Sequence, residues 1–356
     1  MKYPHKLALQ QRVLPSYRVP FFDLLAQRCE GGMALFAGQP RPEEMIASST
    51  QTLAQYTAAQ NVHLFSGGAY LCYQRGIIRW LEEANPQALI VEANPRYLAA
   101  PFAVQWMRAR GRKILGWGLG APRGAGLRGK FWSAYLNQFD GLISYSQRGA
   151  EEYAALGFPR QRIFTAHNAA APKPSTPIAR APLTGTPTVL FVGRLQARKR
   201  VDALLRVCAA LPNPPRLQIV GDGPDRARLE SLARQIFPAA EFIGAKHGAE
   251  LAPYFLQADL FALPGTGGLA IQEAMSYALP VIVAKGDGTQ DDLVRASNGW
   301  MIEPENEAAL FAAMKNALSD SARLRSMGAE SFRIVAEEIN LETMADQFIA
   351  ALNACG

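Results

Sequence analysis

The chain is patterned as short apolar runs separated by longer stretches in which apolar positions recur with a helical period. Two such stretches, 74–84 and 101–111, predict amphipathic helices. Runs that are apolar throughout predict strands buried on both faces, the pattern of a parallel sheet covered by helices. In the first half these runs lie at 6–9, 33–38, 88–93, 113–118, 141–146 and 163–168.

The same alternation of apolar runs and helical stretches starts again after a proline-rich stretch at 171–187. That stretch can continue neither a helix nor a strand. The pattern therefore predicts two α/β domains, 1–171 and 188–334, joined by a linker at 172–187. Ligands of parallel sheets lie beyond the carboxyl ends of the strands, so we expect a ligand in a cleft between the two sheets. The strands predicted for the second half are 188–194, 216–221, 240–245, 258–265, 280–286 and 298–304.

Composition narrows the class of protein. A length of 356 residues favours two domains over one, and 49% hydrophobic against 19% charged residues excludes a disordered chain. No apolar run is long enough to span a bilayer, and the N-terminus lacks the apolar core of a signal peptide, so we expect a cytoplasmic protein. The cysteines have no metal-ligand or redox spacing, and we expect unreactive thiols. They are Cys29, Cys72, Cys208 and Cys355.

The net charge of +7 is unevenly distributed. Residues 1–175 hold 20 Lys/Arg and 10 Asp/Glu, whereas residues 176–356 hold 17 and 20. This asymmetry indicates an anionic partner for the first half, such as a membrane surface, a diphosphate-linked acceptor or nucleic acid. A generically basic soluble surface is the alternative.

Residues 191–202 (FVGRLQARKRVD) indicate a phosphate site. After a predicted strand, Gly193 lets the backbone turn closely, and Arg194 and Lys199 follow. Two cations beyond a parallel strand suit a diphosphate, and each charge-assisted hydrogen bond contributes about 1.5–3 kcal/mol. The alternative is a solvated basic helix start, since further arginines flank the lysine.

A second indication is a glycine cluster before a helix, in residues 263–275 (LPGTGGLAIQEAM). Glycines before a helix N-terminus expose backbone N–H groups to an anion. Glu273 follows Leu269 by four residues on the same helix face, and its carboxylate suits a ribose diol better than a phosphate. An ordinary tight turn with a solvent-facing glutamate is the alternative. The glycines are Gly265, Gly267 and Gly268.

A third loop lies in residues 219–232 (IVGDGPDRARLESL), where Gly221 and Gly223 form a tight turn at a predicted strand end. It is either a simple connection or a loop that closes over a nucleotide base. In this order, and with the segments ADLFALP and ALPVIVA, the three loops resemble the C-terminal domain of GT-B-fold retaining glycosyltransferases. The family is glycosyltransferase family 4, also called glycosyl transferases group 1, and the resemblance covers about Val189 to Pro304.

This resemblance implies a GT-B fold, in which two Rossmann-like domains face a cleft and a C-terminal helix, at about 335–356, crosses back to the first domain. It also implies that Arg194 and Lys199 bind the donor diphosphate, that Glu273 holds the ribose, and that the backbone at 268–269 caps a phosphate.

One position departs from the family pattern. Members usually have two glutamates eight positions apart, the first near the donor sugar and the second on the ribose. The second matches Glu273, whereas the first falls on Gly265 and is followed by Thr266 and Gly267. A roomier site, a different sugar orientation or a degenerate enzyme would each fit this change.

The first domain of such enzymes binds the acceptor, and the candidate contacts here follow predicted strands. Related enzymes often have a histidine near the reacting sugar, and the matching position of this chain is Leu119. Glu92 fits a buried capping role as well as it fits contact with substrate. The candidates are Tyr17, Arg18, Glu92, Asn94, Arg96, Leu119 and Asn168, with His167 a weaker one.

A basic helix with interleaved aromatic residues is predicted within 122–139. Such a helix can lie on an anionic bilayer. The alternative is a helix packed in the core with solvated basic residues, because aromatic residues at helical spacing usually face the core. Its cations are Arg123, Arg128 and Lys130, and its large apolar residues are Leu127, Phe131, Trp132 and Tyr135.

Together these features predict a retaining glycosyltransferase that moves a sugar from a UDP- or GDP-linked donor to a glycan or lipid-linked acceptor, in cell-surface polysaccharide, lipopolysaccharide or glycolipid assembly. The chain has no Asp-x-Asp motif, so we expect neither a metal nor another cofactor. We also expect no nucleic acid, and a cytoplasmic protein that can associate with the inner face of the membrane. The alternatives are a sugar-nucleotide epimerase of similar fold and a non-catalytic nucleotide-sugar-binding or assembly protein.

Overall fold

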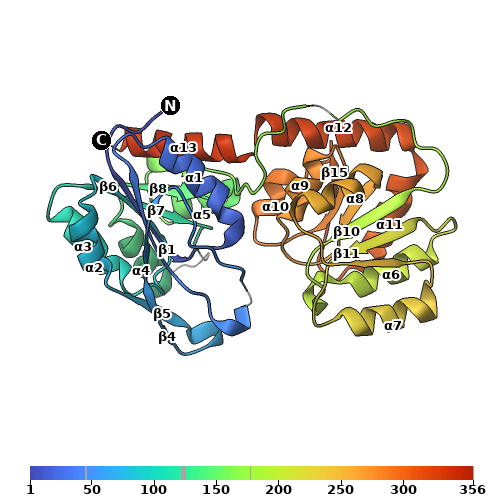
Figure 1. Cartoon of the computed structure of the whole chain (residues 1–356), viewed down its shortest axis with the longest axis horizontal. Coiled ribbons are helices and arrows are strands. Elements are labelled where there is room, and N and C mark those ends of the chain that lie inside the picture. The colour runs from blue at the N-terminus through green and yellow to red at the C-terminus, as the bar shows by residue number, and fades with distance from the viewer. Residues whose placement is uncertain (45, 122–125, 177, 356) are drawn as a thin grey trace. The chain divides into compact units, whose positions relative to one another are not determined.

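The computed structural model describes residues 1–44, 46–121, 126–176 and 178–355. The chain divides into two compact units (Figure 1). The first unit is Met1–Ala170 with Leu341–Gly356, and the second is Ala171–Asn340.

The first unit is built on a seven-stranded parallel sheet of order β3-β2-β1-β6-β7-β8-β9. An antiparallel pair, β4 with β5, stands outside it. The strands are β1 (Leu7–Val13), β2 (Met33–Gly38), β3 (Gln55–Ala58), β4 (Gln60–Leu64), β5 (Leu71–Arg75), β6 (Ala88–Glu92), β7 (Lys113–Gly118), β8 (Gly141–Ser144) and β9 (Ile163–Thr165). The helices are α1 (Val19–Gln27), α2 (Ile77–Ala84), α3 (Ala100–Arg108), α4 (Leu127–Leu136), α5 (Gln147–Ala155) and α13 (Leu341–Ala354).

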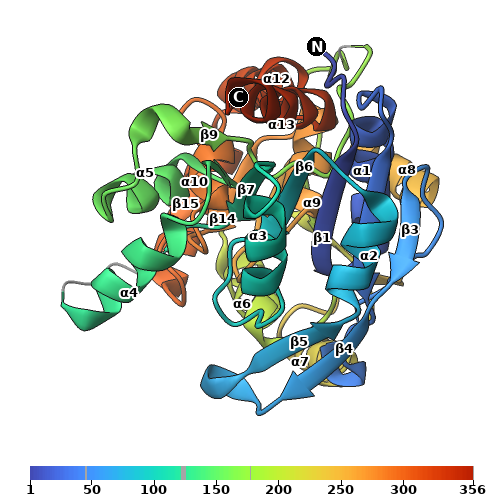
Figure 2. The same cartoon turned by 90° about the vertical axis from the view of Figure 1, so that its left-hand side faces the viewer.

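Both faces of this sheet are covered, as the continuous apolar strands predict. One face packs on α1 and α13, and the other packs on α2, α3 and α4, which Figure 2 shows on the near side of the sheet. The helix α13 buries residues spaced at three and four positions, and its Phe348 ring lies 4.9 Å from the rings of both Phe21 and Trp117. The C-terminal helix therefore belongs to the core of the first unit. It begins at Leu341, later than the expected start at about 335, because the preceding helix α12 continues to Glu337.

One predicted helix starts later than expected. The stretch 74–84 was expected to be helical throughout, but its first residues end the strand β5, and α2 begins at Ile77 after Gly76. Gly76 has a φ of 88°, which turns the chain from the β4–β5 pair into the helix. That pair was missed because its strands are partly exposed and lack a continuous apolar run.

The second unit has a six-stranded parallel sheet of order β12-β11-β10-β13-β14-β15. Its strands are β10 (Thr188–Val192), β11 (Arg216–Val220), β12 (Glu241–Gly244), β13 (Leu260–Leu263), β14 (Val281–Ala284) and β15 (Gly299–Ile302). Its helices are α6 (Val201–Ala210), α7 (Arg226–Ile236), α8 (Ala252–Gln257), α9 (Ala270–Ser276), α10 (Thr289–Leu293), α11 (Glu307–Ser319) and α12 (Ser321–Glu337).

Both sheets share the Rossmann strand order, in which the chain moves outward in one direction and then reverses from the first strand. The reversal lies between β1 and β6 in the first unit and between β10 and β13 in the second. Loops on either side of such a reversal leave a crevice at the carboxyl edge of the sheet, where ligands of this fold bind. The strand order thus selects the loops after β10 and β13 as the place to look for a site.

The proline-rich stretch before β10 contains no helix or strand among its described residues, yet it is not a loose tether. Its Arg180 donates to the carbonyl oxygens of Phe255 (2.6 Å), Ala258 and Tyr277 (2.9 Å), which holds the stretch on the second unit. Desolvation lowers the pKa of this guanidinium to about 10, and it nonetheless stays protonated near neutral pH. The stretch therefore packs as part of the second unit.

Substituting Arg180→Ala is expected to destabilise the second unit by about 2–4 kcal/mol, because several buried carbonyls lose a charged donor together. Hydrogen exchange of α8 and β13 should accelerate accordingly. The matched variant Arg234→Ala, on an exposed residue of α7, should change exchange little. Equal hydrogen-exchange rates of α8 and β13 in the two variants would contradict the anchoring role of Arg180.

Three of the four cysteines are buried, and Cys355 is partly buried. Burial raises the pKa of both Cys29 and Cys208 to about 12, so these thiols are unreactive, as expected. Among the described residues, no helix is both long and apolar enough to cross a bilayer.

Candidate functional site

The candidate site lies at the carboxyl edge of the second sheet, where the loop after β10 meets the loop after β13. The two loops touch through their backbones, since the Thr266 N–H donates to the Arg198 carbonyl oxygen (3.0 Å). Side chains join them as well, because the Arg198 guanidinium donates to the Thr266 hydroxyl (3.3 Å). The structure therefore brings the first and second predicted phosphate loops together across the strand-order reversal.

Gly265 is the point of closest approach between these loops. A Cβ atom there would lie 2.2 Å from the Arg198 carbonyl oxygen and 2.5 Å from the Lys199 Cα, both backbone atoms. No side chain fits without moving one loop away from the other. The glycine that replaces the family's first glutamate is therefore a packing requirement of this loop, and it does not leave a roomier site.

Lys199 is the buried cation of the site, with 8% of its surface exposed. Its ammonium donates to the carbonyl oxygens of Thr266 (2.8 Å) and Gly267 (3.5 Å). Among the described residues no carboxylate pairs with it, and desolvation together with the nearby Arg198 lowers its pKa to about 8. A buried ammonium without a counter-ion favours an incoming anion.

Backbone donors face the same region. Within the described part of the chain, the N–H groups of Gly267, Gly268 and Leu269 make no hydrogen bond. The helix α9 begins at Ala270, one residue after the position predicted. Buried or half-buried N–H groups need acceptors, so this turn is suited to an oxygen-rich ligand.

The third predicted loop packs on the first. A Cβ on Gly221 would lie 2.0 Å from the Gly193 carbonyl oxygen, and one on Gly223 would lie 2.3 Å from that of Leu195. These glycines fix the turn after β10, from which Arg194 extends as a partly buried residue. The positions Gly193, Gly221 and Gly223 thus shape the loop that carries the candidate cation.

Glu273 lies on α9 and is partly buried. Its carboxylate has no hydrogen-bond or ion-pair partner among the described residues, and burial raises its pKa. A partly buried carboxylate that lacks donors can accept hydrogen bonds from a ligand hydroxyl pair.

In the first unit, Arg18 is a structural residue, only 5% exposed. Its guanidinium donates to the Asn168 side chain and to the Ala169 carbonyl oxygen (3.4 Å). It also lies 5.4–5.5 Å from the ring centroids of Tyr17, Trp117 and Tyr145. Arg18 and Asn168 are therefore occupied with each other, whereas Tyr17 keeps 45% of its surface exposed.

Glu92 ends β6 and accepts the Arg12 backbone N–H. This hydrogen bond favours the capping reading of its side chain, and desolvation raises its pKa to about 7. Nearby, the Asn94 side chain accepts the Arg96 N–H (3.1 Å), and Arg96 reaches the Gly68 carbonyl oxygen (3.2 Å). Leu119 is 48% exposed after β7. These loops follow β6 and β7, at the carboxyl edge of the first sheet.

A polar cluster around Arg12 was missed. Its guanidinium pairs with Glu44 (2.9 Å) and lies 5.9 Å from the Tyr70 ring centroid, and the Tyr70 hydroxyl lies 2.9 Å from His63 Nδ1. The signal was present in β1, where the apolar run Leu7–Leu9 is followed by Gln10 and Gln11, and both amides are buried. A buried amide requires polar partners, so it predicts a polar cluster beside it.

The Glu92→Gln variant is expected to remove a pH dependence of stability in the first unit. The folded-state pKa near 7 lies above the ordinary 4.5, so the native state holds the proton more tightly and loses stability as pH rises from 4.5 to 7. The loss should be about 1–3 kcal/mol, discounted for partial exposure. Urea unfolding followed by tryptophan fluorescence at pH 5 and pH 8 measures it, since four of the five tryptophans lie in this unit. An unchanged pH dependence in Glu92→Gln, or the same change in the exposed control Glu82→Gln, would contradict this reading.

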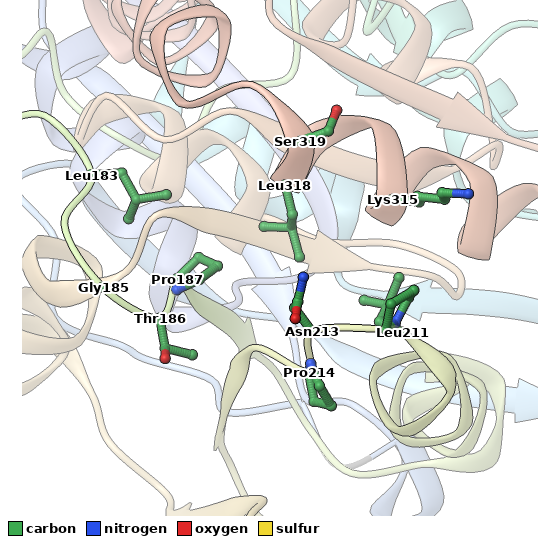
Figure 3. A pocket seen from close by; sticks show the side chains of 11 residues that line it. Leu183, Gly185, Thr186, Pro187, Leu211, Asn213, Pro214, Lys315, Leu318 and Ser319 are labelled. Atoms are coloured by element: carbon green, nitrogen blue, oxygen red, sulfur yellow. The ribbon is translucent and has the colours of Figure 1, made fainter.

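A cavity of about 720 Å³ lies elsewhere in the second unit, at the amino edge of its sheet (Figure 3). It is lined by residues before β10, by the loop before β11 and by the end of α11, with Lys315 as its charged residue. Ligands of parallel sheets bind at the opposite edge, so this cavity is not the phosphate site. No group of three or more metal-ligating side chains occurs in the described ranges.

The chain is similar to known proteins in both sequence and fold. Residues 177–333 match the model of the family described as Glycosyl transferases group 1. A GDP-mannose-dependent alpha-mannosyltransferase of Mycolicibacterium smegmatis is 34% identical over 164 residues, which is 44% of this chain and 42% of that protein. The chain thus matches less than half the length of this curated relative.

Two solved structures match along nearly the whole chain. The lipopolysaccharide outer core galactosyltransferase WaaB, in its apo form, has a TM-score of 0.70 at 16% identity, covering 98% of this chain and 99% of that one. Anabaena Alr3699/HepE in complex with UDP has a TM-score of 0.69 at 15% identity, covering 99% and 100%. Identities this low bear on the fold alone. The chain has the GT-B fold of two Rossmann-like domains, and its residues 177–333 are similar to the glycosyl transferases group 1.

Proposed function

We propose that this protein is a retaining, metal-independent glycosyltransferase whose second unit binds a UDP- or GDP-linked sugar. The observation that carries the proposal is the buried ammonium of Lys199, which lacks a carboxylate partner among the described residues and stands beside three N–H groups without acceptors. A diphosphate supplies the oxygens that both require. Similar proteins include a GDP-mannose-dependent mannosyltransferase and a protein crystallised with UDP, which supports a nucleotide-linked donor.

In the proposed reaction the acceptor hydroxyl attacks the anomeric carbon from the face on which the diphosphate leaves, so the configuration is retained. The bond between the anomeric carbon and the phosphate oxygen breaks, and that leaving oxygen takes up the hydroxyl proton. Negative charge develops on the leaving phosphate, and Lys199, the N–H groups at 267–269 and Arg194 are the groups that would stabilise it. Glu273 accepts hydrogen bonds from the ribose hydroxyls. These groups carry charge stabilisation without a metal ion.

The first unit takes the acceptor in this proposal, a glycan or a lipid-linked sugar of the cell envelope, and the protein works from the cytoplasmic side. Tyr17, Asn94, Arg96 and Leu119 are its candidate contacts, since each lies on a loop at the carboxyl edge of the sheet. The name of WaaB, a lipopolysaccharide enzyme, supports an envelope acceptor.

A second candidate function is a nucleotide-sugar-binding assembly protein without turnover. Gly265 favours it, because the glutamate that family members use near the sugar is absent. To decide, the purified chain is incubated with UDP-glucose, UDP-galactose or GDP-mannose and a bacterial membrane lipid extract, with and without EDTA. Nucleoside diphosphate release that needs the extract, persists in EDTA and is lost in Lys199→Ala but not in Lys315→Ala supports the enzyme. Donor binding without release in any combination supports the assembly protein.

A further inference from the structure

The stretch 93–139 carries eight Lys/Arg residues and no Asp or Glu. The first unit holds 19 Lys/Arg and 12 Asp/Glu, a net charge of +7, so the +8 of this stretch exceeds the net charge of its whole unit. Arg123 lies outside the described residues. The cations are Arg96, Arg108, Arg110, Arg112, Lys113, Arg123, Arg128 and Lys130.

None of the seven described cations of this stretch is paired with a carboxylate in the described part of the chain. Several contact neutral acceptors instead: Arg108 donates to the Gln138 carbonyl oxygen (2.8 Å), and Arg112 to the Asn85 side chain (2.6 Å). Neutral partners leave the charge uncompensated, which creates a positive potential outside this surface.

Two large apolar side chains stand among these cations on α4. Leu127 is 87% exposed and Phe131 is 59% exposed. They are four residues apart and lie on one side of the helix, flanked by the exposed Arg128 and Lys130. Further along the helix, Tyr135 is buried, so only this end of the helix presents apolar groups to the surroundings. The prediction of a core-packed helix therefore holds for Tyr135 and Leu136, and in part for Trp132, which packs against the same core.

The helices α3 and α4 share one face of the unit. Both pack on the same side of the sheet, and the Arg108–Gln138 hydrogen bond joins the ends of the two segments (Figure 2). The neighbouring helices carry carboxylates, Glu82 and Glu83 on α2 and Glu151 on α5, and Asp140 follows the stretch directly. We define the basic face as six exposed side chains near the end of α3 and on α4. Its members are the exposed cations at and just after the end of α3, together with the exposed cations and large apolar side chains of α4: Arg108, Arg110, Leu127, Arg128, Lys130 and Phe131.

We propose that the basic face docks on an anionic lipid bilayer. Leu127 and Phe131 enter the boundary between headgroups and acyl chains, and the arginines and Lys130 lie against lipid phosphates. Charge and apolar exposure occur together, which is what a bilayer interface matches and a soluble polyanion does not. The inference names the membrane partner of the proposed function, but its test uses no donor and no acceptor.

Flotation of the full chain with vesicles tests it. Vesicles of phosphatidylcholine alone are compared with an equimolar mixture of phosphatidylcholine and phosphatidylglycerol. The wild type should float with the anionic vesicles only, and binding should fall as salt rises. Arg128→Glu combined with Lys130→Glu should weaken binding at least about tenfold, as should Leu127→Ser combined with Phe131→Ser.

Matched controls distinguish the loss of the basic face from a change in net charge or in exposed apolar surface elsewhere. The double reversal Arg234→Glu with Lys315→Glu in the second unit changes net charge equally, and Leu53→Ser removes an apolar side chain that is 65% exposed elsewhere in the first unit. Both should float like the wild type. All four variants should keep the wild-type unfolding temperature, because the substituted side chains are exposed.

Three results would overturn the proposal: no difference between the two vesicle types, equal loss in the controls, or full binding by the Leu127→Ser/Phe131→Ser variant. Retention of single-stranded DNA without vesicle binding would assign the face to nucleic acid and would equally overturn it. Nucleotide calorimetry on the same variants keeps this question apart from the proposed function, since a face that docks membranes leaves nucleotide binding unchanged.

Discussion

Replacing Gly265 by glutamate is expected to abolish nucleotide binding, although it restores the residue that the family usually has there. The new Cβ would lie 2.2 Å from the Arg198 carbonyl oxygen, so the loop after β13 must move away from the loop after β10. That movement separates Lys199 from the N–H groups at 267–269. We expect nucleotide affinity to fall at least about 100-fold, equivalent to about 2.7 kcal/mol.

Two further variants make this prediction specific. Gly265→Ala should lose most of the affinity as well, because the clash begins at Cβ and needs no charge. Gly68→Ala should bind like the wild type, since a Cβ there meets no atom within 4 Å. Calorimetric titration with the nucleotide that the wild type prefers measures all three. Wild-type affinity in Gly265→Glu would show that the loop contact is not part of the site.

Nucleotide affinity is also expected to decline in alkaline solution because of Lys199. Burial lowers its pKa to about 8, so below that pH the ammonium is already present to meet a diphosphate. Above it, binding must first take up a proton, and affinity should fall by up to about tenfold per pH unit until the pKa of the bound state is reached. The diphosphate itself is fully ionised throughout this range and adds no slope.

Lys199→Ala should lose affinity at neutral pH by roughly 10- to 100-fold and show no alkaline decline, since one charge-assisted contact is gone. Lys199→Arg should keep its charge and bind equally at pH 7 and pH 9.5. The control Lys315→Ala, at the opposite edge of the sheet, should reproduce the wild-type profile. A wild-type profile that stays flat to pH 9.5 would exclude Lys199 as the anion's partner.

The sequence was most informative where local chemistry and strand order coincide. Arg194, Lys199 and Gly265 follow strands whose apolar runs are unambiguous, so their loops could be assigned to one edge of a sheet before the structure was known. The same alternation of apolar runs and helical stretches in both halves likewise predicted two parallel sheets covered by helices, and both are observed.

Sequence periodicity was less informative about which groups each side chain contacts. Nothing in the pattern around Arg18 distinguishes a substrate contact from a guanidinium enclosed by three aromatic rings, because two of those rings, Trp117 and Tyr145, come from distant segments. The same limit applies to Leu127 and Phe131, whose helical spacing is typical of core residues although both are exposed. Position 265 shows the converse, since a glycine that looks like a lost side chain proves to be required by a neighbouring loop.

The measurement that tests the central claim most directly is calorimetric titration of UDP, GDP and ADP into the wild type, first in EDTA and then with Mg²⁺. The account predicts that one nucleotide binds equally well in both conditions, and that Lys199→Ala and Glu273→Ala both weaken it. If no nucleotide binds the wild type in either condition, the loops after β10 and β13 are not a donor site, and the proposed glycosyltransferase loses its chemical basis.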